Sequence, residues 1–189
     1  MKSGARPLAC GTVKISCTLA STDASRVSNK AVVESCARIE ATLGESAAFR
    51  RVDRELYVVK QGSAYVLIHV LPAAAGQALV RMVAPLVRNA AMNEALAMRL
   101  LELNARLRFG SFGYVKEGQV VTFSHTLLGG RTLDREELLS ALRDVAVLAD
   151  EWDSRIAADA GGETFEMALQ DELVARLQRE LVEPSWRSN

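Results

Sequence analysis

The sequence predicts an α+β fold in the order helix-β-β-β-helix-β-β-helix, with an antiparallel sheet packed against helices and a C-terminal amphipathic helix after it. Apolar residues repeat every three to four positions in some segments and every second position in others, as they do in amphipathic helices and strands. The segments between neighbouring strand runs are short, which favours antiparallel hairpins. With 189 residues, the chain is long enough for one domain with a proper core.

The chain divides into three parts. Residues 1–27 are rich in Ser, Thr, Ala and Gly and have no sustained apolar period, which predicts a variable or poorly ordered arm. Residues 28–160 carry the periodic pattern of the α+β domain. Residues 161–189 are predicted to be a C-terminal helical extension, with Pro184 as the expected stop of its helix.

The first helix is predicted from Ser28 or Asn29, either of which can serve as N-cap, to a stop at Gly44. Its apolar stripe, with 4-3-4 spacing, consists of Val32, Cys36, Ile39 and Leu43. Because Cys36 lies on this stripe, we interpret it as a small buried hydrophobe.

Three strand-like runs follow, at residues 49–60, 64–71 and 78–87. The middle run is apolar on both faces, with Val66, Ile68 and Val70 on one and Tyr65, Leu67, His69 and Leu71 on the other. An antiparallel sheet with one wet side would alternate instead, so an end of this chain or another chain must cover the second face. Pro85 cannot donate to a strand ladder, which predicts that the third run is an edge strand or is bulged.

The second helix begins after Asn93, a good N-cap, and is apolar over most of its circumference. Its main stripe consists of Leu96, Leu100, Leu103 and Leu107, and a further apolar flank consists of Met98, Leu101 and Ala105. A helix with this pattern is buried on two sides. A dimer interface would supply the second side.

Two more strands, at residues 110–116 and 119–128, turn at Glu117-Gly118. In the second of them, Val121, Phe123, His125 and Leu127 share an apolar face. The third helix opens with Asp134 and Glu137 as a capping-box pair and ends at Gly161-Gly162. The last helix, at residues 164–182, has an apolar stripe that consists of Phe165, Leu169, Leu173, Leu177 and Leu181. Two alternatives stay open for this helix: packing within the chain, where it would cover the second sheet face, or docking onto a partner.

The sequence contains no catalytic, metal, nucleotide or other cofactor signature. Glycines 110 and 113 open a strand, whereas a phosphate-binding loop opens a helix. His125 stands on an apolar strand face, which favours a core side chain over a general base. The acidic cluster of Asp150, Glu151 and Asp153 favours a solvated helix face over a cation site.

Composition argues against several classes of partner. Lys+Arg and Asp+Glu are equal at 23 each, so no global field attracts nucleic acid or an anionic membrane. No apolar run approaches the ~20 residues that a membrane-spanning helix needs. The three cysteines, an odd number, favour reduced thiols and a cytoplasmic protein.

One stretch carries a family resemblance. It begins with LLELNARLRFGSFGY at residues 100–114 and continues with the Glu117-Gly118 turn, SHTLLG at residues 124–129 and ADEWD at residues 149–153. With this order of elements, the chain resembles the YbjN-like family, whose fold is that of the type III secretion chaperones, over residues 30–158. It differs from secretion chaperones in lacking their usual acidic character and in adding a C-terminal helix.

The resemblance implies a bacterial, non-enzymatic protein without a cofactor, commonly a homodimer, that binds a protein or peptide client. The implied client surface consists of Tyr57, Val59, Tyr65 and Leu67. The implied dimer seam consists of Met98, Leu101, Phe112 and Tyr114.

Two other hypotheses stay open. The first is a small-ligand-binding protein or enzyme that uses His125 together with the Asp150 cluster. The second is a structural subunit of a larger assembly that docks through its C-terminal helix.

Overall fold

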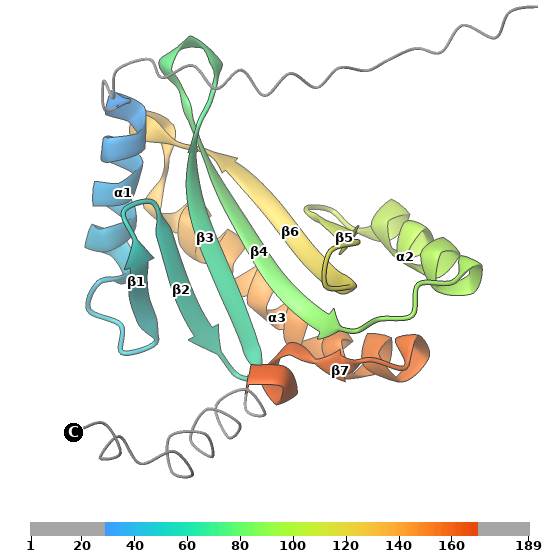
Figure 1. The fold of residues 1–189 in the computed structure, drawn as a ribbon. Helices are drawn as coiled ribbons and strands as arrows, with labels where there is room; N and C mark the ends of the chain where they lie inside the picture. Colours follow the sequence, from blue (N-terminus) through green and yellow to red (C-terminus); the bar gives the residue numbers. More distant parts are fainter. Residues whose placement is uncertain (1–28, 170–189) are drawn as a thin grey trace, which may run out of the picture.

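The computed structural model describes residues 29–169, and these residues form one antiparallel sheet with helices packed against one of its faces. The strand order is β1-β2-β3-β4-β6-β5, and a short strand β7 pairs with β4 off this path. Figure 1 shows α3 running behind the sheet, with α1 at the β1–β2 end and α2 beside β5. The predicted α+β class is confirmed. The predicted N-terminal arm and all but the first turn of the predicted C-terminal helix lie outside the described residues.

Helix α1 (Lys30–Leu43) begins and ends where the sequence predicts. The Asn29 side chain accepts a hydrogen bond from the backbone N–H of Ala31, and Gly44 donates its N–H to the carbonyl of Glu40. These bonds satisfy groups that a helix end leaves without an intrahelical partner. Val32, Ile39 and Leu43 of the predicted stripe are buried, and Cys36 is half-buried beside them.

The predicted strand at residues 49–60 is two strands, β1 (Phe49–Asp53) and β2 (Leu56–Gln61), so this prediction was wrong. A turn at Arg54 and Glu55 separates them, and the Asp53 carboxylate accepts the backbone N–H of Arg54 at 2.7 Å. Three successive charged residues favour a turn here because Asp hydrogen-bonds readily to the backbone that follows it.

Strands β3 (Ala64–Pro72) and β4 (Ala78–Arg88) complete the first half of the sheet. β4 lies between β3 and β6, so Pro85 is not on an edge strand. The alternative prediction is confirmed, since the β4–β6 register shifts between Pro85 and Val87. A bulge tolerates proline because the residue there needs no regular ladder bond. Beyond the bulge, Val87 pairs with Thr164 of β7 (Glu163–Thr164), a strand too short for a sequence pattern.

The second half of the domain follows the predicted order: α2 (Glu94–Arg106), β5 (Ser111–Val115), β6 (Val120–Leu128) and α3 (Arg135–Ala160). The predicted N-caps are in place, with Asn93 accepting from Leu96 N–H and Asp134 accepting from Glu136 and Glu137 N–H. Gly161 follows α3 with φ 65°, in the left-handed region that favours glycine at a helix end.

The strand register sorts side chains onto two faces. Tyr57, Ile68, Met82 and His125 are paired across β2, β3, β4 and β6 and point to the face that α1 and α3 cover. Their neighbours along each strand point to the other face, which we call the open face. The open face consists of Leu56, Val58, Lys60, Tyr65, Leu67, His69, Leu71, Leu79, Arg81, Val83, Pro85, Thr122, Ser124, Thr126 and Leu128. Within residues 29–169, no helix has the length and apolarity needed to cross a membrane.

Ser35 links α1 to the loop after β6, and its removal is expected to destabilise the fold. Its hydroxyl donates to the carbonyl of Ala31 at 2.7 Å and accepts the buried N–H of Gly130 at 2.6 Å. Ser35→Ala leaves that N–H without a partner and is expected to lower the free energy of unfolding by about 2 kcal/mol. Urea denaturation followed by circular dichroism measures the change. Ser140→Ala, at an exposed position of α3, is the control, and equal losses in the two variants would contradict the prediction.

Candidate functional site

The open face combines half-buried apolar side chains with basic ones. Its centre consists of Val58, Leu67 and Val83, which are paired across β2, β3 and β4. Lys60, His69 and Arg81 lie among them, and the strands β2, β3, β4 and β6 place no carboxylate on this face. Such a surface favours a partner that offers apolar side chains with acidic ones nearby.

The structure divides the four predicted client-binding residues between the two faces. Tyr65 and Leu67 lie half-buried on the open face. Tyr57 and Val59 are buried on the helix-covered face, and the hydroxyl of Tyr57 donates to Glu40 Oε1 at 2.9 Å. Burial in particular raises the pKa of Tyr57, which keeps the phenol neutral as a donor. The open face therefore presents Tyr65 and Leu67 to a partner, and Tyr57 and Val59 support the sheet from the other side.

The chain itself reaches one end of the open face. The Phe165 ring lies 6.1 Å from the ring of Tyr65, edge to face, and Glu166 pairs with Lys60 at 3.1 Å. The Lys60 ammonium also lies 5.0 Å from the centre of the Tyr65 ring. Contacts with Tyr65 and then Glu166 raise the pKa of Lys60. A helix that begins at Phe165 thus starts on this face.

The predicted dimer residues fall into an exposed pair and a covered pair. Met98 and Leu101 project from α2 with 52% and 61% of their surface exposed. Tyr114 is half-buried, and Phe112 is buried against Phe123, with the ring centres 5.1 Å apart. The second apolar side of α2 is therefore uncovered in the single chain.

Strand β5, next to α2, is an edge strand whose outward backbone groups are partly occupied. The Asn104 side chain accepts the N–H of Phe112 at 2.7 Å and donates to the carbonyl of Phe112 at 3.1 Å. It thus takes the place of a neighbouring strand at that residue. Tyr114, two residues further, directs its backbone groups to the same open edge.

His125 and Asp150 do not meet, which removes the geometry required by the enzyme hypothesis. His125 packs against Phe109, with the ring centres 5.4 Å apart, and its β4 partner Met82 is paired with Ile68. Asp150 instead accepts hydrogen bonds from the backbone and hydroxyl of Ser63. Ile68 and Ser63 are five residues apart, about 16 Å along a strand. No cluster of three metal-ligating side chains occurs within residues 29–169.

The Asp150 carboxylate binds the β2–β3 turn to α3 through its hydrogen bonds with Ser63. Its contribution to stability is expected to depend on pH. The hydroxyl and backbone N–H of Ser63 lower its pKa from the ordinary value. A lowered pKa means that the carboxylate stabilises the folded state above pH ~4, and that this contribution is lost as pH falls through the folded-state pKa.

Asp150→Asn is therefore expected to lose about 1 kcal/mol at pH 7, a modest value because the side chain is exposed. The difference from the wild type is expected to shrink as pH falls from ~4 through the folded-state pKa, because the wild-type carboxylate becomes protonated over this range. Thermal denaturation at pH 7 and at a series of acidic pH values measures it. Ser63→Ala removes the hydroxyl donor, keeps the backbone N–H, and is expected to weaken the same pH dependence. A pH-independent difference would contradict this role.

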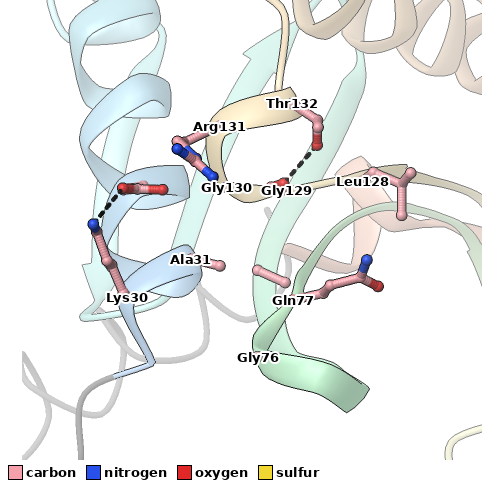
Figure 2. Close-up of a pocket in the computed structure, with 11 residues that line it drawn as sticks. Lys30, Ala31, Gly76, Gln77, Leu128, Gly129, Gly130, Arg131 and Thr132 are labelled. Atoms are coloured by element: carbon pink, nitrogen blue, oxygen red, sulfur yellow. Dashed lines mark hydrogen bonds and ion pairs between the residues drawn. The ribbon is translucent and has the colours of Figure 1, made fainter.

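A cavity of about 350 Å³ lies between the start of α1 and the loop after β6 (Figure 2). Of its charged lining residues, Lys30 and Glu34 pair with each other at 3.8 Å, and Arg131 is exposed. The hydroxyl of Thr132 donates to the carbonyl of Gly129 at 2.9 Å. Lys30, Glu34 and Thr132 are thus already engaged, and the lining offers no nucleophile beside a base.

Sequence reasoning missed Val58, Val83 and Arg81 as members of the candidate surface. The period-two pattern of residues 78–87 contained the signal for Val83 and Arg81, since they alternate with the buried Val80, Met82 and Ala84. Nothing in the local pattern of residues 56–59, all four apolar, distinguishes the face of Val58 from that of Tyr57.

Comparison with known proteins gives one family and one fold. Residues 30–168 match the model of the family TY-Chap1, described as T3SS (YopN, CesT) and YbjN peptide-binding chaperone 1. No curated protein matches the sequence. Among solved structures, a chain of the crystal structure of the ExsC-ExsE complex is similar, with a TM-score of 0.53 and 16% identity. The similarity covers 65% of this chain and 93% of that one, and at this identity it shows the fold alone.

Proposed function

Since this chain belongs to the TY-Chap1 family of T3SS and YbjN peptide-binding chaperones, we propose that it is a dimeric, non-enzymatic protein that holds a peptide segment of a client on its open face. The observation that carries this proposal is the composition of that face. Apolar side chains at Val58, Leu67 and Val83 form a continuous strip, and Lys60 and Arg81 flank it without a carboxylate among the four strands.

The charge on this face selects the client chemistry. Apolar side chains of the client would bury against the strip, at roughly 25 cal/mol per Å² of apolar surface removed from water. Acidic side chains of the client would pair with Lys60 and Arg81, which gives orientation more than affinity. The proposed client is therefore a segment in which apolar and acidic residues alternate.

The experiment is binding of the full-length protein to an array of 15-residue peptides with alternating apolar and acidic residues. Leu67→Asp places a charge at the centre of the strip. It is expected to raise the dissociation constant for these peptides at least tenfold, a loss of about 1.4 kcal/mol in binding free energy. Val147→Asp is the matched control, because Val147 is exposed on α3, on the other side of the sheet. Equal binding by the two variants, or no binding by the wild type, would contradict the proposal.

The proposed dimer uses the outer side of α2. Met98 and Leu101 are the exposed pair on this helix, and Tyr114 on the edge strand β5 continues the surface. Phe112 is buried and supports this surface indirectly. Its ring packs 6.1 Å from that of Trp152 and so holds β5 against α3. Two copies that join these surfaces would cover the second apolar side of α2.

A further inference from the structure

The described chain ends on the open face. After α3, Val87 and Arg88 pair with β7, and Gly162 passes so close to the Arg88 carbonyl that a Cβ would lie 2.4 Å from it. The following residues turn onto the open face, where Phe165 meets Tyr65, Glu166 meets Lys60 and Ala168 is buried. The C-terminal segment is therefore anchored at one end of the surface proposed for the client.

The sequence after this anchor continues the same pattern. Phe165 and Leu169 are the first two members of an apolar stripe that repeats every four residues to Leu181. A helix over residues 165–182 would be about 27 Å long at 1.5 Å per residue. From Tyr65 to Leu71 the open face measures about 20 Å along the strands, and four strands span about 14 Å. The length of the segment thus matches the diagonal of the face.

Charge gives a second, independent argument. Residues 163–183 hold six acidic side chains and two arginines. The open face of β2, β3, β4 and β6 holds Lys60, Arg81 and His69 without a carboxylate. The pair of Glu166 with Lys60 is the first contact of this kind, and it lies where the segment enters the face.

We propose that residues 165–182 form a helix that docks on the open face of its own chain and covers Tyr65, Leu67 and Val83. If the proposed client site is correct, on which this consequence rests, a client must displace the segment to bind. The chain then carries its own competitor, and removal of the segment would raise the affinity for clients.

Thiol labelling of the full-length chain tests the docking without any client. Cys10, Cys17 and Cys36 are replaced by serine, and Val83→Cys places one thiol at the centre of the open face. The reagent is dithiobis-nitrobenzoate, and the variant pair Leu173→Asp and Leu177→Asp removes two apolar members of the stripe. We expect these aspartates to raise the labelling rate of the thiol at position 83 at least about fivefold, because a buried thiol reacts only when its cover opens.

The control is the same experiment with the thiol at position 147, on exposed α3, where the aspartates are expected to leave the rate unchanged. An unchanged rate at position 83 would overturn the proposal. Protection at position 83 that falls on dilution would also overturn it, because the segment would then dock on a second copy. Binding to the peptide array is measured separately, so a protein with a protected open face but no peptide binding would retain the docking and lose the proposed function.

Discussion

Replacing Phe123 by alanine is expected to lower the free energy of unfolding by about 4 kcal/mol. Phe123 is fully buried on β6, and its ring packs edge to face against Phe112 at 5.1 Å and Phe109 at 6.2 Å. Truncation leaves a cavity that these neighbours cannot fill, because β5 and the segment after α2 are each fixed by their own contacts. Urea denaturation followed by circular dichroism gives the free energy of unfolding.

The matched control for Phe123→Ala is Val147→Ala, which removes apolar atoms from an exposed site and is expected to change stability by less than about 0.5 kcal/mol. The large loss expected for Phe123→Ala follows from the close packing of its ring against the Gly110 backbone, where a Cβ would lie 2.5 Å from the ring. Backbone and ring thus fit closely at the join, the segment that links α2 to β5. A loss below about 1 kcal/mol in Phe123→Ala would mean that the join repacks and is not a rigid part of the core.

The helices and their caps could be predicted because the information is local. The 4-3-4 stripes of α1 and α2, and the capping side chains of Asn29, Asn93 and Asp134, all act within one or two helical turns. The face shared by Phe123 and His125 was likewise predicted, since alternating apolar and polar residues in β6 fix its phase.

The assignment of Tyr57 could not be predicted, because its segment is apolar on both faces. Leu56 and Val58 point to one side of the sheet and Tyr57 and Val59 to the other, and only pairing with β3 decides which side is covered. The turn at Gly62 and Ser63 joins β2 to β3 and fixes that register. The turn at Arg54 joins β1 to β2, and no break in the strand pattern marks it, because the pattern continues on both sides. The same limit applies to Phe112, whose burial depends on Trp152, far along the chain.

The role of Asn104 also lies beyond the sequence pattern. Its position on α2 indicates only a polar residue beside an apolar stripe. In the fold it binds both backbone groups of Phe112, so it orients α2 along the β5 edge and leaves Met98 and Leu101 facing outward. The exposed pair predicted from the helix pattern therefore owes its orientation to a contact that no helix period encodes.

Changing Met98 and Leu101 together to aspartate is expected to convert the proposed dimer to a monomer. Each side chain exposes more than half of its surface in the single chain, and in a dimer each would be buried twice, once per copy. Loss of this burial is expected to cost at least about 4 kcal/mol, which raises the dissociation constant about a thousandfold. Light scattering at micromolar concentration is expected to give twice the 20.5 kDa chain mass for the wild type and a single chain mass for the variant.

The dimer prediction is separable from a loss of folding, because the two replaced side chains are exposed and contribute little to the core of their own chain. The double variant is therefore expected to stay folded as a single chain, with little loss of that chain's own stability. Phe123→Ala, in contrast, is expected to lower the thermal midpoint of unfolding. Val33→Asp, at an exposed site on α1, is the control and is expected to leave the mass of the dimer unchanged. A wild-type protein that stays monomeric, or a double variant that stays dimeric, would show that two copies do not meet through the outer side of α2.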